Sequence, residues 1–409
     1  MQHETPSVAG SRPNLTIVIP ALDEAEAIGS TIQRCLDARP HIKAEGAVDD
    51  VEIVVVSDGS SDGTAEIARG FADVSVIEFP INRGYGAAIK AGFAAGSGAL
   101  VGFLDADGTC DPLFFADLCR ALQQQDADVV LGSRMSSESR MPWIRTLGNR
   151  MYALLLSFLA NRRVSDTASG MRVMRRSSLP DLGPLPDGLH YTPAMSARAV
   201  LKGLTVVEIP MSYDERIGES KLRISRDGWR FLQAILDGML LFRPERMFVL
   251  LAALFLVAAT LLSLGPVDFY IRNGEVEEWM IYRFLVAFLL GGAGLFALIG
   301  TAIISQMARL VLDREDGSLW NGVLVNAFRG PRVVVLVIVL FAASLALVWP
   351  GIVEYVRTGH VTMHWSRVMV AAFGMLVAVQ AALTAILLRV TNLWLEFAVD
   401  GGRTSLRGH

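Results

Sequence analysis

The chain divides into two regions that differ in how apolar residues are spaced. Up to about residue 245, short runs of apolar and β-branched residues alternate with longer stretches of mixed character. The short runs predict strands at residues 15–19, 52–56, 74–79, 100–104 and 128–132, and the longer stretches predict helices at 24–36, 64–71, 85–95 and 112–124. Strands that alternate with helices predict an α/β fold, in which helices cover both faces of a parallel sheet.

Four long apolar stretches follow, and each is long enough to cross a bilayer. They are Met247–Leu264, Ile281–Met307, Val333–Val353 and Val368–Leu393. They predict a four-helix transmembrane domain over residues 246–395 and a tail at 396–409. The connection after the second stretch carries Arg309, Arg314, Arg329 and Arg332, whereas the connection after the first is mostly acidic. Because positive residues stay on the cytoplasmic side, we expect the N-terminal region and both termini in the cytoplasm, at the inner membrane.

Residues 223–245 predict an amphipathic helix between the two regions. Apolar side chains recur at three- and four-residue spacing, from Trp229 through Ile235 to Met239, with charged and polar residues mostly between them. Pro244 is expected to end this helix before the first membrane crossing. The tryptophan and arginine content suggests a helix that lies in the membrane interface. A helix that packs onto the N-terminal domain is the alternative.

Polar residues gather where the predicted strands end. The segments P-A-L-D-E, S-D-G-S-S-D-G-T, P-I-N-R-G-Y-G and D-A-D-G-T directly follow the first four strands. Since ligands bind beyond the carboxyl ends of the strands in such sheets, we expect these segments to form one site. Asp105 and Asp107 end the fourth strand, and two carboxylates there need a compensating charge. A Mg²⁺ or Mn²⁺ ion shared with the phosphates of a substrate would supply it.

Composition and motifs narrow the classes of function. The 409 residues are 52% hydrophobic with a formal net charge of −4, which argues against nucleic acid as a partner. Three widely spaced cysteines give neither a disulfide framework nor a zinc site. The chain has no G-x-x-x-x-G-K-[ST] loop, and the dinucleotide pattern that starts at Gly84 lacks its third glycine. Residues 1–14 lack the apolar core of a signal peptide and are expected to form a disordered tail.

The ordered polar segments resemble the motifs of family 2 glycosyltransferases with the GT-A fold. The segments that carry the resemblance are Pro20–Glu24, Val56–Ser60, Asn82–Gly84, Asp105–Asp107 and Gly132–Arg134. Two later segments, Ser165–Arg176 and Tyr213–Leu222, resemble the polyprenyl- or dolichyl-phosphate glycosyltransferase branch, to which dolichol-phosphate mannose synthase belongs. The resemblance implies a catalytic GT-A domain over residues 15–222, and the amphipathic helix and membrane helices after it match the same branch.

The resemblance also implies roles for individual residues. Asp58 would accept a hydrogen bond from the nucleotide base, and Asp105 and Asp107 would hold the metal ion. Thr109 stands where mannose synthases often have a glutamine, which favours a UDP-hexose donor slightly over GDP-mannose. The other residues implied in substrate binding are Pro20, Leu22, Glu24, Ala106, Arg134 and Arg172.

Three further residues are implied in catalysis together with Asp107. Arg216 and Lys221 would bind the leaving diphosphate and the acceptor phosphate, and Asp166 would orient or deprotonate the acceptor. The reaction implied is the inverting transfer of a hexose from a nucleotide-diphosphate sugar to a polyprenyl phosphate. A phosphate monoester is largely ionised at neutral pH because its second pKa is about 6, so the reaction requires no strongly activated base.

Two other functions remain open for this combination of domains. A processive polysaccharide synthase would carry a Q-x-x-R-W motif, and the segment Gln306–Leu310 lacks the tryptophan. A lipid transporter with a nucleotide-binding domain would favour ionisable residues within the spans, and the few present, such as Arg389, lie mostly near span ends. Small residues at 291–294 would permit close helix packing within the chain or in a homo-oligomer.

Overall fold

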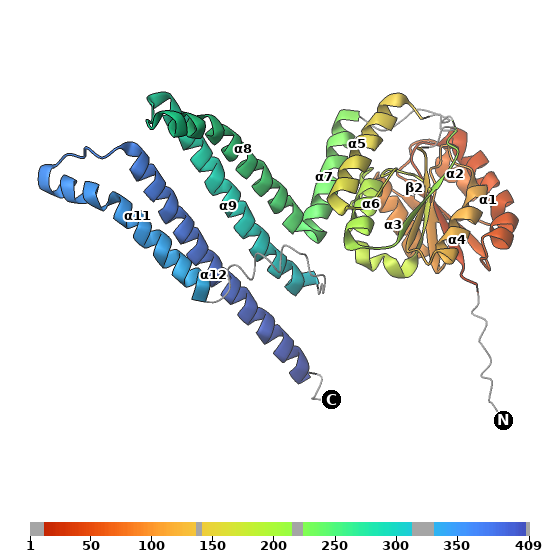
Figure 1. Cartoon of the computed structure of the whole chain (residues 1–409). Coiled ribbons are helices and arrows are strands. Elements are labelled where there is room, and N and C mark those ends of the chain that lie inside the picture. The colour runs from red at the N-terminus through yellow and green to blue at the C-terminus, as the bar shows by residue number, and fades with distance from the viewer. Residues whose placement is uncertain (1–11, 136–140, 215–223, 313–330, 406–409) are drawn as a thin grey trace. The chain divides into compact units, whose positions relative to one another are not determined.

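The computed structural model describes residues 12–135, 141–214, 224–312 and 331–405 of the chain (Figure 1). The chain forms two compact units, Met1–Phe242 and Arg243–His409. The boundary falls beside Pro244, where the sequence predicts the end of the amphipathic helix.

A seven-stranded sheet forms the centre of the first unit. Its strands are β1 (Leu15–Ala21), β2 (Val51–Asp58), β3 (Ser75–Phe79), β4 (Leu100–Phe103), β5 (Val129–Ser133), β6 (Arg172–Arg175) and β7 (Val206–Pro210). The spatial order is β3-β2-β1-β4-β6-β5-β7, and every neighbouring pair is parallel except the two pairs that involve β6. The mostly parallel sheet confirms the predicted α/β class. A mostly parallel sheet is also what the resemblance to the GT-A fold implies, and the unpredicted strand β6 is the one that runs against its neighbours β4 and β5 among the described strands.

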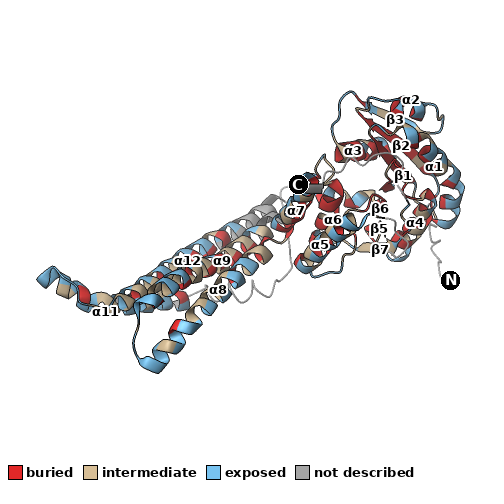
Figure 2. Cartoon of the chain, turned by 90° about the horizontal axis from the view of Figure 1, so that it is seen from above, coloured by how far each residue is buried: buried red, intermediate tan, exposed pale blue. Residues whose placement is uncertain are grey.

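Helices cover both faces of this sheet (Figure 1). They are α1 (Ala25–Glu45), α2 (Thr64–Arg69), α3 (Tyr85–Ala95), α4 (Phe115–Gln124), α5 (Trp143–Ala160), α6 (Tyr191–Lys202) and α7 (Ile224–Phe242), with short 3₁₀ turns at Pro112–Phe114, Arg176–Ser178 and Pro180–Leu182. Ile17 and Ile19 of β1 pack in one buried layer with Ile28 of α1, whereas Val18 packs in the other layer with Ile89 of α3. Successive β1 residues therefore enter opposite layers, as the two-residue period of a strand requires. All of β1 is buried between them (Figure 2).

The first four strands end along one edge of the sheet. Ala21 at the end of β1 pairs with Ser57 of β2, and Asp58 at the end of β2 pairs with Phe79 of β3. β4 lies on the other side of β1. The strand order therefore reverses between β1 and β4, which is the kind of switch point where α/β sheets bind ligands.

Helix α7 is amphipathic, as predicted for residues 223–245, and it ends before Pro244. Ile235 and Met239 are fully buried, and the helix packs against α6 and α5. Trp229 remains at the surface, 61% exposed. The apolar face of α7 thus packs within the first unit, as the domain-packing alternative requires.

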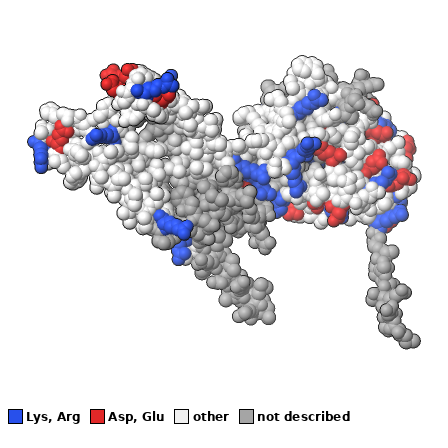
Figure 3. Space-filling model, in the orientation of Figure 1, with Lys and Arg blue, Asp and Glu red and all other residues white. Residues whose placement is uncertain are grey.

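Four long helices make up the described part of the second unit. They are α8 (Pro244–Asn273), α9 (Glu278–Leu312), α11 (Pro331–Thr358) and α12 (Trp365–Ser405). Each contains a stretch that is long and apolar enough to span a membrane, in agreement with the four predicted crossings. α8 packs along α9, α11 packs along α12, and α12 also contacts α9. Much of the surface of this unit carries no charged side chains (Figure 3).

Small and polar residues of the second unit are used in packing within the chain. A Cβ atom added at Gly294 of α9 would lie 2.7 Å from the side chain of Leu256 of α8. The hydroxyl of Thr391 on α12 donates a hydrogen bond to the side chain of Gln306 on α9. α12 continues as a helix to Ser405, through most of the segment 396–409 that the sequence assigns to a tail, and the tail stays a prediction. No proline interrupts this part of the sequence, so the helix can propagate.

Candidate active site

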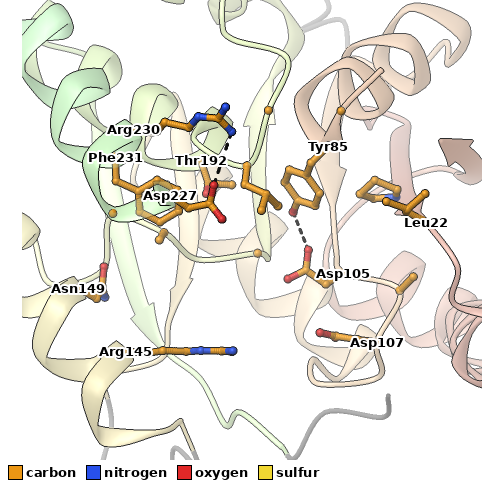
Figure 4. A pocket seen from close by; sticks show the side chains of 18 of the residues that line it. Leu22, Tyr85, Asp105, Asp107, Arg145, Asn149, Thr192, Asp227, Arg230 and Phe231 are labelled. Carbon is orange, nitrogen blue, oxygen red and sulfur yellow. Dashed lines mark hydrogen bonds and ion pairs between the residues drawn. The ribbon is translucent and has the colours of Figure 1, made fainter. Parts of the chain in front are cut away.

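A cavity of about 520 Å³ lies at the carboxyl ends of the strands (Figure 4). Its acidic wall comes from the strand ends and comprises Glu24, Asp58, Asp105 and Asp107. Its cationic wall comes from the segment after β5 and from α5 and α7, and comprises Arg134, Arg145, Arg226 and Arg230. The structure thus brings together eight of the predicted substrate and metal residues, namely Pro20, Leu22, Glu24, Asp58, Asp105, Ala106, Asp107 and Arg134.

The two carboxylates that follow β4 are held by hydroxyl groups. The phenol of Tyr85, the first residue of α3, donates a hydrogen bond of 2.6 Å to Oδ1 of Asp105. Thr109 donates to Oδ1 of Asp107 from its hydroxyl at 2.7 Å and from its backbone amide at 3.2 Å. Thr109 itself is buried and does not line the cavity, so it acts on the cavity through Asp107.

The acidic wall fits a divalent cation that is shared with a bound phosphate. Asp105 and Asp107 line the same cavity, while the described residues contain no group of three or more His, Cys, Asp or Glu side chains that would hold a metal unaided. A hard cation held by one or two carboxylates completes its coordination with phosphate oxygens and water. A Cβ atom at Gly170 would fall 2.1 Å from Oδ2 of Asp105, so the absence of a side chain there leaves room for this carboxylate.

Asp58 anchors the loop between β3 and α3. Its buried carboxylate accepts backbone hydrogen bonds of 2.6 Å from Arg83 and 2.8 Å from Gly84. Burial raises the pKa of Asp58, and these two hydrogen bonds only partly oppose the rise. The residue therefore shapes the cavity through the loop that it holds, and its predicted contact with a nucleotide base stays a prediction.

Arg134 on the cationic wall is held by a buried aspartate. Its Nε and Nη2 atoms donate to the two carboxylate oxygens of Asp166 at 2.8 and 2.9 Å, and its backbone amide donates at 3.0 Å. Asn149 of α5 and the amide of Ala168 also donate to Asp166, each at 3.0 Å. Burial alone would raise the pKa of Asp166, but the arginine and the hydrogen bonds hold it below its ordinary value.

Asp166 therefore lies behind the cavity as a positioning residue for Arg134. Its side chain is fully buried and it does not line the cavity. A carboxylate with a lowered pKa and this many donors is a poor proton acceptor. The geometry favours a role for Asp166 in orienting Arg134 over the deprotonation of the acceptor that the sequence left open.

Arg172 does not lie in the cavity, where the sequence predicted a substrate contact. The side chain is fully buried below the cavity, where its guanidinium donates to the Ser196 hydroxyl at 3.1 Å and the Ser169 carbonyl at 2.9 Å. It also lies over the ring of Phe103, and burial lowers its pKa to about 10. Side chains alternate between the two faces of the unpredicted strand β6, and the side chain of Arg172 points into the core. A direct contact between Arg172 and the substrate is therefore not supported. Arg216 and Lys221 lie outside the described residues.

Comparison with known proteins places the chain in a family. The model for glycosyl transferase family 2 matches residues 16–183. A dolichyl-phosphate hexose transferase of Haloferax volcanii is 33% identical over 213 residues, which are 51% of this chain and 86% of that protein. The chain belongs to glycosyltransferase family 2.

Other relatives of this glycosyltransferase point to the same branch. The low-salt glycan biosynthesis hexosyltransferase Agl6 of Haloferax volcanii is 32% identical over 273 residues, which are 64% of this chain and 63% of that protein. The polyprenol monophosphomannose synthase of Mycolicibacterium smegmatis is 31% identical over 237 residues, which are 54% of this chain and 84% of that protein. The resemblance to the polyprenyl- and dolichyl-phosphate branch is thereby confirmed.

Among solved structures, the chain has a more distant likeness. Glucosyl-3-phosphoglycerate synthase from Mycobacterium tuberculosis, in complex with Mn²⁺, UDP and phosphoglyceric acid, is 21% identical. The match covers 55% of this chain and 78% of that one, with a TM-score of 0.46.

Arg145 is a cavity residue of this glycosyltransferase that the sequence did not predict. It projects from α5 into the cavity, opposite the side that carries Asp107 (Figure 4). Arg145 stands four residues before Asn149, so both lie on the same face of α5, and Asn149 reaches the buried Asp166. The only sequence signal was this spacing, and α5 was not among the predicted helices.

Arg226 and Arg230 of α7 also line the cavity. Both are paired with the buried Asp227, at 3.4 Å from Arg226 Nε and at 3.6 Å from Arg230 Nη1 (Figure 4). The hydroxyl of Tyr152 on α5 donates to the Gly228 carbonyl at 2.8 Å and so links α5 to the same turn of α7. The cationic wall is thus held together by contacts between two helices.

One face of α5 is apolar and exposed within the first unit. Its side chains recur at spacings of three and four residues and are between 51% and 75% exposed. They form what we call the α5 stripe: Trp143, Leu147, Met151, Leu154 and Phe158. The opposite face of the helix is buried, so α5 is apolar on both sides, which is unusual for a helix whose surroundings are only water.

Proposed function

We propose that this membrane glycosyltransferase transfers a hexose from a nucleotide-diphosphate sugar to a polyprenyl or dolichyl phosphate. The observation that carries the proposal is a cavity with an acidic wall suited to a metal-bound diphosphate and a cationic wall suited to a second phosphate. The names of the relatives support the lipid phosphate as acceptor. We favour a UDP-sugar such as UDP-glucose as donor, with GDP-mannose as the alternative.

In this proposal the acidic wall binds the donor. Asp105 and Asp107 would hold a Mg²⁺ or Mn²⁺ ion, which neutralises charge on the departing diphosphate when bound. Pro20, Leu22 and Asp58 line the part of the cavity next to β1 and β2, where the nucleoside would lie. Arg134, oriented by its buried partner, would add a planar pair of donors for the diphosphate oxygens.

The cationic wall would bind the acceptor. Arg145 faces the metal carboxylates across the cavity, so a phosphate held there would lie close to the donor sugar. An acceptor oxygen would form the new bond to the anomeric carbon on the face opposite the leaving diphosphate, whose bond breaks with inversion. The acceptor phosphate needs no base because it is already largely ionised, with a second pKa of about 6. This agrees with the buried position of Asp166.

We propose further that the first unit docks on the lipid surface through the α5 stripe. The same chain carries four candidate membrane spans, the first of which begins at Pro244 directly after α7. Burying the exposed apolar side chains of the stripe in the interface would be favourable, at roughly 25 cal/mol per Å². The arginines of the connection between the second and third spans support a cytoplasmic site, because positive residues stay inside.

The test is an assay of the full chain in detergent or liposomes with polyprenyl phosphate and labelled UDP- and GDP-sugars, with Mn²⁺ or with EDTA. We expect metal-dependent transfer of one hexose to the lipid, and a loss of at least 100-fold in Asp107→Asn because a metal ligand is neutralised. Asp111→Asn is the matched control, since Asp111 is half-buried and caps a short 3₁₀ turn outside this cavity. Nucleotide binding without lipid product from any donor would contradict the proposed acceptor.

A further inference from the structure

Tyr85 contacts one of the two metal carboxylates from a distant part of the chain. It belongs to the segment after β3, and its phenol donates to Oδ1 of Asp105 at 2.6 Å (Figure 4). Thr109, by contrast, donates to Asp107 from only two residues further along the chain. The Tyr85 contact therefore orients Asp105 from a separate element of the fold.

The position of Tyr85 is fixed on both sides along the backbone. Just before it, the amides of Arg83 and Gly84 donate to the buried carboxylate of Asp58. Just after it, the amides of Gly86 and Ala87 donate to the carbonyl of Asp187, at 2.6 and 3.1 Å. These contacts hold the first turn of α3, so the phenol reaches Asp105 from a rigid element.

The ring and hydroxyl of Tyr85 are equally constrained. The ring meets Phe103 edge to face, with a centroid distance of 6.4 Å and an interplanar angle of 82°. The Asp105 carboxylate can only accept in this contact, so the phenol O–H is the donor.

The other side of the Asp105 carboxylate is bounded by the backbone at Gly170. A Cβ atom there would lie 2.1 Å from Oδ2 and 2.7 Å from Cγ of Asp105. No side chain larger than hydrogen is compatible with this carboxylate position. Asp105 is thus held between a hydrogen-bond donor and a closely approaching backbone.

We propose that Tyr85 and Gly170 are positioning residues that hold Asp105 in the orientation a divalent cation requires. The inference rests on the proposed function, because it assumes that Asp105 is a metal ligand. Residues that orient a ligand from outside the coordination shell typically change metal affinity 10- to 100-fold when they are replaced. The cause is that a free carboxylate must lose its rotational freedom on binding, whereas a pre-oriented one has already done so.

The first test replaces Tyr85 with phenylalanine in the full chain and measures Mn²⁺ binding directly. Mn²⁺ is titrated in the presence of UDP, and separately of GDP, and the free ion is followed by electron paramagnetic resonance. We expect the dissociation constant for Mn²⁺ to rise at least tenfold in Tyr85→Phe. The matched control is Tyr191→Phe, because its ring also meets Phe103 edge to face, at 6.2 Å, while its buried hydroxyl has no partner among the described residues. We expect that control to bind Mn²⁺ as the wild type does.

The second test replaces Gly170 with alanine, which should weaken Mn²⁺ binding by at least as much because the carboxylate has to move. Tyr85→Phe decides the inference alone if Gly170→Ala does not fold. Unchanged Mn²⁺ affinity in Tyr85→Phe would overturn the inference and leave the proposed transfer reaction intact. A wild-type chain that binds no Mn²⁺ with either nucleotide would overturn both the inference and the proposed metal.

Discussion

The two walls of the cavity are built in different ways. The acidic wall comes from short segments at the ends of parallel strands. Its carboxylates at the ends of β2 and β4 accept hydrogen bonds from neighbouring loops and from the first residue of α3. The cationic wall comes from the segment after β5 and from two helices, one of which exposes an apolar stripe. The donor half of the site thus depends on the compact sheet, whereas the acceptor half depends on helices that we expect to meet the membrane.

The walls also differ in the contacts that orient them. Arg134 is oriented by the fully buried carboxylate of Asp166. Asp105 and Asp107 accept hydrogen bonds from the hydroxyls of Tyr85 and Thr109. We expect the acidic wall to bind the divalent cation, because carboxylate oxygens are the ligands that such an ion prefers.

The largest effect should come from breaking the buried pair that orients the cationic wall. Asp166→Asn leaves Arg134 without its charged partner, and we expect the free energy of unfolding to fall by about 3–5 kcal/mol. Because the pKa of Asp166 is lowered by folding, its contribution is present above the pKa of an unfolded aspartate and is lost as the pH falls through the folded value.

Denaturant unfolding of the detergent-solubilised chain measures this loss. Asp181→Asn is the control, because it removes an exposed ion pair with Lys202 and should cost at most about 1 kcal/mol. Equal losses in the two variants would show that the buried pair contributes no more than a surface pair.

A smaller effect should separate the two walls kinetically. Arg145→Gln removes a cation from the proposed acceptor site, and we expect the KM for polyprenyl phosphate to rise about 10- to 100-fold, as for loss of a charge-assisted hydrogen bond. The KM for the nucleotide sugar should change less than threefold, which steady-state kinetics with each substrate varied in turn will show. Arg150→Gln is the control, because Arg150 is exposed on the same helix and does not line the cavity. If the KM for the nucleotide sugar rose instead, Arg145 would belong to the donor site and not to the acceptor site.

A several-fold effect should follow from weakening the α5 stripe. The double variant Leu154→Ser and Phe158→Ser removes two exposed apolar side chains, and we expect transfer to long-chain polyprenyl phosphate in liposomes to fall about three- to tenfold. Transfer to a short-chain acceptor in detergent should be unaffected. Ile67→Ser is the control, since Ile67 is an exposed apolar residue of α2. An equal loss with both acceptors would mean that the stripe supports folding and not docking.

The smallest effect should be a pH dependence of the acidic wall. Because burial raises the pKa of Asp58, this carboxylate takes up its proton at a higher pH than an ordinary aspartate. Protonation removes an acceptor from the amides of Arg83 and Gly84, so we expect nucleotide affinity to fall a few-fold as the pH falls through the raised pKa of Asp58. Calorimetric titrations of UDP at several pH values will show it. Asp58→Asn should bind with a weaker but flatter pH profile, and an equally steep profile would point to another group.

The acidic wall can be predicted from the sequence because its information is local. Short apolar and β-branched runs identify the strands β1 to β4. Because these strands are parallel, the residues that follow them meet at one edge of the sheet, independently of the rest of the fold. The order of these segments along the chain is therefore enough to group Asp58, Asp105 and Asp107 in one site, and all three line the cavity.

Apart from Arg134, the cationic wall could not be predicted because it depends on contacts between distant segments. Arg172 has the sequence context of a site residue, but the antiparallel strand β6 places it in the core. Arg145 has the context of an ordinary surface arginine, but the packing of α5 beside the sheet end brings it into the cavity. The fold of the first unit was also only partly predicted, since nothing in the spacing of residues 172–175 indicates that this strand runs against its neighbours.

A single residue, Arg243, separates the end of α7 from the start of the first membrane span. One residue extends at most about 3.6 Å, so the end of α7 stays within about that distance of the start of the first candidate span. The first unit is therefore tethered to the bilayer by a very short link. A lipid acceptor would then meet the enzyme by lateral diffusion in the plane of the membrane and not by a search through a three-dimensional volume. The rate of encounter should therefore follow the surface density of the acceptor, and crowding or dilution of the membrane would control the reaction more directly than the amount of lipid in the cell.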